Sequence, residues 1–266
     1  MKNYQLLDSG DGQKWERFGE YTLLRPCAQA VWRPSLKVPV DGTFNRDEKW
    51  AFHKKLPKSW TVLHGGVEFQ ISPTDFGHLG VFPEHADLWE GVRPLLRKGA
   101  RVLNLFAYSG GATLAAAQEG AEVCHVDASK GMVDWARQNA ALNQLQKAPI
   151  RWIVDDVMKF LRREKKRESL YDAIVLDPPT FGRGSQGEVF KIERDIIPLL
   201  ELCSELLTKK PLFVIFSCHT PGFTPLCMRH LLGQTMPKGT LEVGEMALHS
   251  PETLSIPSGS FAKWIP

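Results

Sequence analysis

From residue 86 onward, short apolar runs alternate with amphipathic stretches, and this alternation limits the possible folds more than any other feature. The apolar runs cover 100–108, 121–127, 150–156, 171–177 and 211–218, and helical patterns separate them. Such alternation indicates parallel strands joined by crossover helices that cover both faces of one sheet. Two further strand-like runs, 241–249 and 260–265, have no helix between them, so we expect them to form an antiparallel edge.

The first 75 residues have a different character, with four of the eight tryptophans, many turn residues and little helical periodicity. Residues 60–71, "WTVLHGGVEFQI", consist of two β-rich runs about a His-Gly-Gly turn, which is typical of a hairpin. We therefore expect a small N-terminal β-rich domain over 1–75 and a larger domain over 76–266.

Composition excludes several classes of protein. The 266 residues are 43% hydrophobic and 24% charged, as in ordinary globular proteins, and the net charge of +3 permits a nucleic-acid partner without arguing for one. No apolar run approaches the roughly 20 residues of a membrane span, and the N-terminus lacks a signal-peptide pattern. Five scattered cysteines without a C-x-x-C pair suit a reducing cytoplasm better than disulfides or a zinc site. A cytoplasmic protein without a metal is expected.

The ends of the predicted strands carry the residues of greatest chemical interest, because ligands of open α/β sheets bind beyond the carboxyl ends of the strands. The first strand runs into "NLFAYSGGAT", where Gly110 and Gly111 would let the backbone approach a ligand closely before the next helix begins. An ordinary strand-to-helix turn explains this stretch about equally well.

Acidic residues follow the next three strands. Asp127 lies where nucleotide-binding folds engage ribose hydroxyls, Asp155 and Asp156 could accept an adenine amino group, and Asp177 precedes two prolines. Each acid could instead cap the following helix. Three successive acidic strand ends after a glycine turn are much harder to explain as independent caps, so together they favour a nucleotide-like cofactor.

The motifs "NLFAYSGG", "VDASKGMVDWARQN", "VDDVMKFL" and "LDPPTFGRG" resemble those of class I S-adenosylmethionine-dependent methyltransferases. In order and spacing they are similar to the bacterial 23S rRNA methyltransferases that modify cytosine C5 or guanine N7. The resemblance covers residues 76–220, including "FGHLGVFPEH", while residues 1–75 do not resemble the RNA-binding PUA module of many such enzymes. The resemblance implies an α/β fold with a Rossmann-like seven-stranded sheet, mostly parallel with an antiparallel edge. It also implies an enzyme that methylates large-subunit rRNA.

The resemblance also implies a site. S-adenosyl-L-methionine would bind along the strand ends, with Asp127 accepting both ribose hydroxyls and Asp156, rather than Asp155, accepting from the adenine N6. Asp177 would face both the methyl group and the base, as a catalytic residue. The remaining implied cofactor contacts are Phe82, Asn104, Phe106, Ala107, Tyr108, Ser109, Gly110, Ala128, Ser129, Asp155 and Pro178, and the implied substrate contacts are Pro179, Phe181 and Arg183.

The methylated atom stays open between two chemistries. Thr180 stands where enzymes that methylate exocyclic amines typically carry an aromatic residue, which lowers that class of target. Methylation of cytosine C5 needs a thiolate, and Cys218 in "FSCHT" is the candidate, with His219 able to lower its pKa; an inert buried thiol is nearly as good an explanation. Guanine N7 has its own lone pair and needs no thiol.

Two stretches and three other functions complete the predictions. The loop 182–195 has the composition of a lid that closes on substrate, and the basic run 159–168 is typical of a solvated helix face. Methylation of a protein or small molecule remains the main alternative. A nicotinamide-dependent dehydrogenase is disfavoured because G-x-G-x-x-G is absent, and a non-catalytic cofactor-binding scaffold is disfavoured by the full set of acids.

Overall fold

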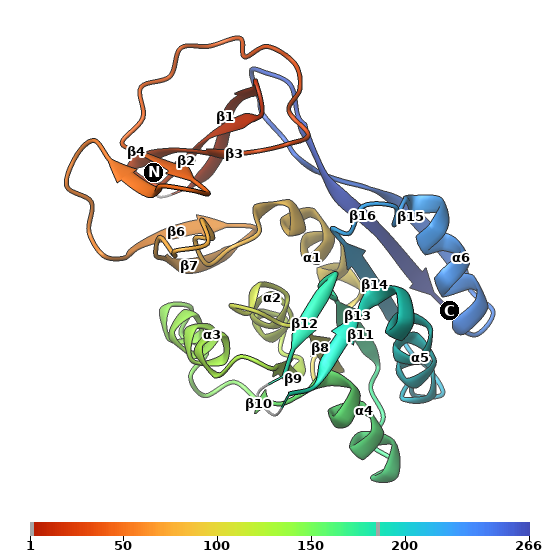
Figure 1. Ribbon diagram of the computed structural model, residues 1–266. Helices are drawn as coiled ribbons and strands as arrows, with labels where there is room; N and C mark the ends of the chain where they lie inside the picture. Colours follow the sequence, from red (N-terminus) through yellow and green to blue (C-terminus); the bar gives the residue numbers. More distant parts are fainter. Residues whose placement is uncertain (1–2, 185–186) are drawn as a thin grey trace. The chain divides into compact units, whose positions relative to one another are not determined.

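The computed structural model describes residues 3–184 and 187–266, which form two compact units (Figure 1). The N-terminal unit comprises Met1–Ala86 and Ala247–Ser258, and the second unit comprises Asp87–Met246 and Gly259–Pro266. The chain therefore returns to the N-terminal unit near its end. The assignment of catalysis to residues 76–266 stays a prediction.

The N-terminal unit is built from two sheets. Its five-stranded sheet has the order β1-β2-β3-β4-β5, antiparallel except that β3 and β4 run parallel. The strands are β1 (Tyr4–Gly10), β2 (Gln13–Phe18), β3 (Tyr21–Pro26), β4 (Gly42–Asn45) and β5 (Lys49–Phe52). A separate hairpin pairs β6 (Trp60–His64) with β7 (Val67–Ile71), and a 3₁₀ turn η1 (Pro83–His85) follows. The β-rich character of this region and the 60–71 hairpin are both confirmed.

The turn of the β6–β7 hairpin and the segment Ala247–Ser258 (the late segment) both help to hold the N-terminal unit together. Gly65 and Gly66 have φ of +55° and +70°, the left-handed values that a two-residue hairpin turn demands and that glycine adopts readily. Leu248 and Ile256 of the late segment are buried in one apolar cluster with Leu6 of β1. Residues nearly the whole chain apart therefore share one small core.

The second unit contains the predicted seven-stranded sheet, in the order β10-β9-β8-β11-β14-β16-β15. Neighbours from β10 to β14 pair in parallel, and β16 runs antiparallel to β14. The strands are β8 (Arg101–Leu105), β9 (Glu122–Asp127), β10 (Ile150–Val154), β11 (Ala173–Leu176), β14 (Phe213–Cys218), β15 (Thr240–Leu248) and β16 (Ile256–Ile265). The expected Rossmann-like sheet with an antiparallel edge is confirmed.

Helices cover both faces of this sheet, because successive strand residues point to opposite sides. Leu103 and Leu105 of β8 pack in the cluster that contains α4, α5 and α6, whereas Val102 packs in the cluster that contains α1 and α2. The helices are α1 (Ala86–Val92), η2 (Arg93–Leu95), α2 (Gly111–Gln118), α3 (Lys130–Leu142), α4 (Val157–Lys166), α5 (Ile192–Glu205) and α6 (Pro225–Thr235).

One sequence expectation was wrong in its local structure. The segment between Asp177 and α5 was expected to be a long loop, but it contains a hairpin of β12 (Phe181–Arg183) and β13 (Val189–Lys191). The part of the predicted lid at 185–186 lies outside the described residues. The described ranges contain no helix of the length and apolar content that crossing a membrane requires.

Candidate active site

The segment after β8 has an unusual backbone. Phe106 and Tyr108 have φ of +54° and +49°, a region that non-glycine residues seldom adopt, and Gly110 has φ +94°. Two hydrogen bonds fix this turn: the Ala107 N–H donates to the Val126 carbonyl at 3.1 Å, and the buried Asn139 side chain donates to the Ser109 carbonyl at 2.9 Å. Strained backbone that its surroundings hold in place is typical of ligand-binding turns.

The two glycines of this turn are required by packing inside the protein. A Cβ on Gly110 would lie 3.1 Å from the Cβ of Ala136 in α3, and one on Gly111 would lie 2.6 Å from the Trp89 ring in α1. The pattern "SGG" alone led us to expect close approach to a ligand. The structure shows that close approach of α1 and α3 is reason enough for the small residues.

Asn104 and two neighbours form a buried polar network at the start of α2. The Asn104 amide donates to the Thr113 hydroxyl at 2.9 Å, and that hydroxyl lies 2.9 Å from Nδ1 of His125. Burial, with the nearby charge of Arg137, lowers the pKa of His125 to about 3, so the imidazole is neutral. Asn104 is 4% exposed, and its described contacts order the turn from within.

Asp127 ends β9 and is held by two backbone donors. Its Oδ2 accepts the Tyr108 N–H at 2.9 Å, and its Oδ1 accepts the Ser129 N–H at 2.8 Å. Burial raises the pKa of Asp127, and the two N–H groups partly oppose that rise. The cap of α3 is instead Ser129, whose hydroxyl accepts from Met132 N. Asp127 is thus tied to the β8 turn, and each oxygen keeps a second lone pair.

The two acids after β10 have different local partners. Asp156 caps α4 by accepting the Lys159 N–H at 2.9 Å, which is the alternative that the sequence left open. Asp155 forms an ion pair with Arg163, also on α4. The Asp155 N–H donates to the Asp127 carbonyl at 3.1 Å, so the ends of β9 and β10 lie side by side.

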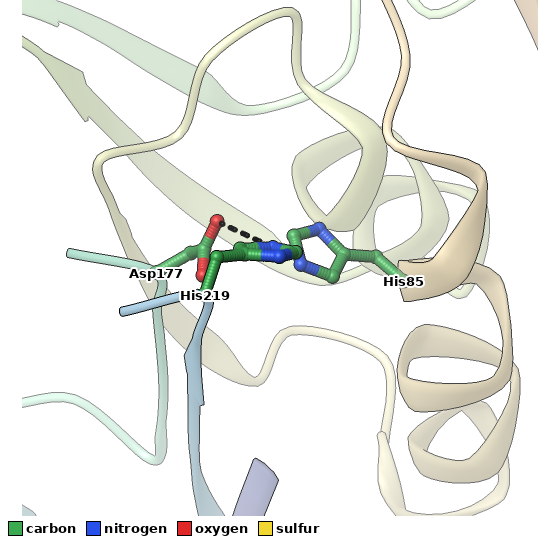
Figure 2. A group of neighbouring side chains, drawn as sticks. All are labelled: His85, Asp177 and His219. Atoms are coloured by element: carbon green, nitrogen blue, oxygen red, sulfur yellow. Dashed lines mark ion pairs between the residues drawn. The ribbon is translucent and has the colours of Figure 1, made fainter. Parts of the chain in front are cut away.

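Asp177 follows β11 and is held from β14. The Ser217 hydroxyl donates to Asp177 Oδ1 at 2.8 Å, and His219 Nε2 lies 3.8 Å from Asp177 Oδ2, the pair marked in Figure 2. Pro178 is buried, whereas Pro179 is exposed. A half-buried carboxylate therefore stands on a rigid corner with one oxygen fixed, while the second faces an imidazole.

Cys218 ends β14 but has the properties of a core thiol. It is 1% exposed within the α4–α5–α6 cluster, and burial raises its thiol pKa. The imidazole of His219 is directed to Asp177, so the expected lowering of the thiol pKa is not found. A nucleophilic cysteine needs the opposite conditions, a lowered pKa and an accessible sulfur.

The β12–β13 hairpin presents the implied substrate residues. Phe181 is 49% exposed, and the Arg183 guanidinium lies 5.6 Å from its ring centroid. The hairpin is anchored on its β13 side, by Phe190, whose ring centroid lies 5.3 Å from that of Phe106, and by an ion pair between Glu188 and Lys159. It is therefore a tethered flap over the strand ends.

Three contacts were missed by the sequence reasoning. Ser217 holds Asp177, Asn139 holds the β8 turn, and the Thr180 and Thr220 hydroxyls bond at 2.7 Å to join the loops after β11 and β14. The sequence gives one weak indication of a role for Ser217, because it is a polar residue just before the end of a buried strand. Phe82, by contrast, belongs to the N-terminal unit, near His78 and His85, and its place at the cofactor stays a prediction.

A parallel sheet in the order β10-β9-β8-β11-β14, with acids at the ends of β9, β10 and β11, defines an α/β protein of the nucleotide-cofactor class. Residues 46–227 match the model of the S-adenosylmethionine-dependent methyltransferase family, and the chain belongs to that family. A crystal structure of a SAM-dependent methyltransferase from Agrobacterium tumefaciens is 38% identical, with a TM-score of 0.95 over all of this chain and 91% of that one.

Curated relatives are longer than this chain. The ribosomal RNA large subunit methyltransferase K/L of Syntrophotalea carbinolica is 36% identical over 59% of this chain and 22% of its own length. The protein of that name from Alteromonas mediterranea is 34% identical over 78% of this chain and 29% of its own length. The chain thus spans less than a third of these relatives.

Proposed function

We propose that the protein transfers the methyl group of S-adenosyl-L-methionine to a base of large-subunit ribosomal RNA in the cytoplasm. The observation that carries the proposal is the pair of fixed carboxylates, Asp127 and Asp177, at the ends of β9 and β11 on either side of the strained β8 turn. Family membership supports the cofactor, and the names of the curated relatives support the RNA substrate.

The residues of the strand ends fit the proposed cofactor. Asp127 keeps one lone pair on each oxygen, which suits the two hydroxyls of a ribose. The Asp156 oxygen that does not cap α4 suits the adenine amino group. Phe106, Tyr108 and Gly110 form a turn with left-handed φ that suits the methionine portion. When bound, the cofactor supplies an activated methyl group on a sulfonium.

The protein's own contribution to the reaction is positioning and charge. Asp177, fixed by Ser217 and its proline corner, holds a carboxylate in one place beside the presented base. Its negative charge also stabilises the positive charge that develops on a ring nitrogen as that nitrogen gains a methyl group. Phe181 on the tethered flap offers a ring on which an unstacked base can lie.

The burial of Cys218 favours a target atom that needs no covalent intermediate. Cytosine C5 methylation requires a thiolate to add to the ring, and a sulfur that is 1% exposed with a raised pKa is poorly suited to that task. Guanine N7 attacks with its own lone pair. We therefore favour guanine N7 over cytosine C5, with Cys218 as a packing residue.

The test uses purified protein, radiolabelled cofactor and large-subunit rRNA transcribed without modifications, followed by mass mapping of the methylated nucleotide. We expect one methylguanine, and loss of most activity in Asp177→Asn. Cys218→Ala should keep activity to within about threefold of Cys203→Ala, a matched control because Cys203 is fully buried in the same cluster with its pKa raised to about 12.

Two outcomes would contradict the proposal in different ways. Failure of the wild-type protein to label any rRNA, while it still binds the cofactor, would remove the RNA substrate. A methylcytosine product, together with loss of activity in Cys218→Ala but not in Cys203→Ala at equal thermal stability, would restore the thiol mechanism.

A further inference from the structure

One segment of the N-terminal unit, residues 46–58, carries a net positive charge. Its sequence, "RDEKWAFHKKLPK", contains five basic and two acidic side chains. All five basic residues of the segment are exposed, and Lys54 is paired with Asp41 at 2.8 Å.

Aromatic rings are interleaved with these charges. The rings of Trp50 and Phe52 on β5 are stacked, with centroids 5.6 Å apart and an interplanar angle of 7°, and Phe52 is 46% exposed. Phe44 on β4 packs beside Trp50 at 5.2 Å. Alternating cations and aromatic faces at the edge of a sheet are typical of surfaces that bind single-stranded nucleic acid.

A pocket of about 210 Å³ lies within the same unit and shares Arg46 with the basic segment. Its lining includes Lys14, Arg25, Arg46, His78 and Phe76. The acidic side chain in the lining is Glu84 of η1. Phe76 is 79% exposed, more than any other phenylalanine in the described part of the chain. The volume is below the range for drug-sized ligands, so it suits one small group such as a single nucleotide's base or phosphate.

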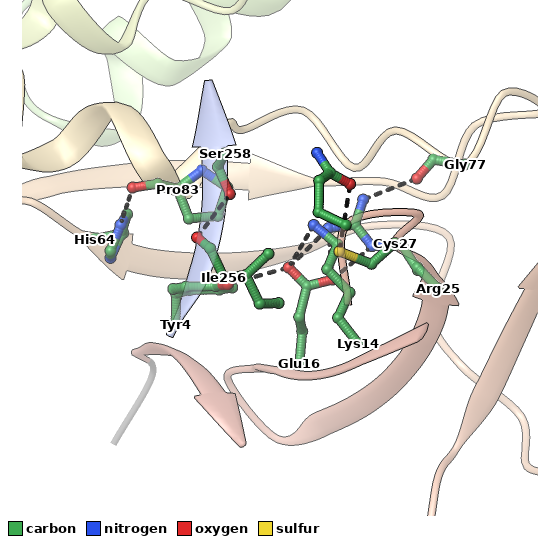
Figure 3. Close-up of polar contacts among 11 residues, drawn as sticks. Tyr4, Lys14, Glu16, Arg25, Cys27, His64, Gly77, Pro83, Ile256 and Ser258 are labelled. Carbon is green, nitrogen blue, oxygen red and sulfur yellow. Dashed lines mark hydrogen bonds and ion pairs between the residues drawn. The ribbon is translucent and has the colours of Figure 1, made fainter. Parts of the chain in front are cut away.

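Two of the lining residues, Arg25 and Lys14, belong to a buried ionic cluster with Glu16, which Figure 3 shows. Arg25 donates from Nε and Nη2 to Glu16 at 2.7 and 2.9 Å and from Nη1 to the Gly77 carbonyl at 2.9 Å. Lys14 lies 3.4 Å from the same carboxylate. Burial alone would raise the pKa of Glu16, but Arg25 and Lys14 outweigh it and hold that pKa below its usual value. Glu16 is therefore ionised, and Arg25 is fixed by three hydrogen bonds.

Gly77 gives the pocket its wall. It has φ +78°, and a Cβ there would lie 2.5 Å from the ring of Phe44, so only glycine lets this segment lie against β4. Trp50 fastens the same segment by donating its indole N–H to the Thr74 carbonyl at 2.8 Å. These contacts leave the Phe76 ring exposed beside the cations.

Arg46 and Phe76 are exposed groups of the pocket lining. Within the described residues, no hydrogen bond or ion pair engages the guanidinium of Arg46, whereas Arg25 is committed to Glu16. A guanidinium binds phosphate oxygens through paired N–H groups, and a phenyl ring stacks on any base. A duplex hides its base faces, so the combination suits a single strand.

We propose that the N-terminal unit binds single-stranded RNA, with one nucleotide in this pocket: its base on Phe76, its phosphate on Arg46 with Lys14, and the neighbouring backbone along residues 46–58. This inference rests on the proposed RNA substrate and names the part of the chain that holds the strand. The five cations attract phosphates, and the exposed rings can stack on bases. A protein partner carries neither group, so it fits this surface less well.

The test measures binding of the full-length protein to a fluorescein-labelled single-stranded RNA of about 12 nucleotides, within the usual site size, at several salt concentrations. Phe76→Ala should weaken binding about five- to 100-fold through loss of base stacking. Arg46→Ala should weaken it about five- to tenfold and reduce the salt slope by about 0.7, the value for one phosphate contact. Matched controls are Lys210→Ala, an exposed cation of the second unit, and Val31→Ala, an exposed apolar residue of the N-terminal unit.

Methyl transfer to rRNA by the same variants separates the two proposals. We expect Phe76→Ala and Arg46→Ala to raise KM for RNA while kcat and cofactor affinity stay within about twofold. If the wild type methylates rRNA but these variants bind and react as the controls do, the inference is wrong and the proposed function stands. If the wild type binds neither the single strand nor rRNA, both fall, and equal binding to the same RNA annealed to its complement would overturn the single-strand specificity.

Discussion

Replacing Asp127 by asparagine tests the cofactor assignment with the least change in shape. In the wild type, Oδ1 accepts from Ser129 N and Oδ2 accepts from Tyr108 N, so both oxygens are anchored and both retain acceptor capacity. Asparagine replaces one oxygen by an NH₂ group, which would face a backbone donor and could no longer accept from a ribose hydroxyl.

The size of the effect follows from these contacts. A hydrogen bond to a charged group contributes about 1.5–3 kcal/mol, and each 1.4 kcal/mol changes an affinity about tenfold. Loss of one ribose contact should therefore raise the Kd for S-adenosylmethionine by about ten- to 150-fold. Isothermal titration calorimetry at neutral pH measures it, with Asp134→Asn as the control, since Asp134 is an exposed carboxylate on α3. Binding by Asp127→Asn within about threefold of the wild type would refute the reasoning.

The pH dependence of cofactor affinity also tests the role of Asp127. Burial raises the pKa of Asp127 above its ordinary value of 3.8, and the ionised form is the one that accepts two hydroxyls. Affinity should therefore fall as pH is lowered toward that raised pKa, at a higher pH than an exposed aspartate would give. Asp127→Asn should show no such fall between pH 7 and about pH 4.

Three further substitutions test individual contacts within the two units. Ser217→Ala removes the donor to Asp177 and should lower kcat about tenfold in a steady-state methylation assay while the Kd for the cofactor stays within about twofold; a larger change in that Kd would contradict a role at Asp177 alone. Glu16→Gln leaves Arg25 buried without its counter-charge and should cost about 3–5 kcal/mol of unfolding free energy in urea at pH 7. Because the folded pKa of Glu16 is lowered, the wild type should lose this advantage as pH falls below about 4.5, and a pH-independent difference would argue against the ion pair. Gly77→Ala should cost about 2–4 kcal/mol, from left-handed strain plus overlap with an adjacent ring, and a change under 1 kcal/mol in the same titration would contradict the close packing.

The main sheet could be predicted because its strands are buried on both faces. Runs such as "AIVL" at Ala173–Leu176 are apolar throughout and are separated by helices long enough for right-handed crossovers, so local pattern and topology agree. The acids at the strand ends were visible for the same reason, since each follows the last buried residue of a strand.

The pairing of β12 with β13 was missed because these strands are three residues long, too short to show an alternating pattern. This pairing depends on tertiary contacts such as Phe190 with Phe106. The packing reasons for Gly110 and Gly111, and the tie from Ser217 to Asp177, likewise join residues whose proximity no local pattern encodes. For Cys218 the sequence posed the correct alternatives, and burial is the property that distinguishes them.

The segment Ala247–Ser258 has a consequence for how the protein is made. It supplies Leu248 and Ile256 to the core around Leu6, and Thr253 donates to the Leu7 carbonyl at 3.2 Å. Synthesis from the N-terminus normally lets the first domain fold first. Here β1 is synthesised long before Leu248 and Ile256, so the core around Leu6 is completed only when residues 247–258 have been made.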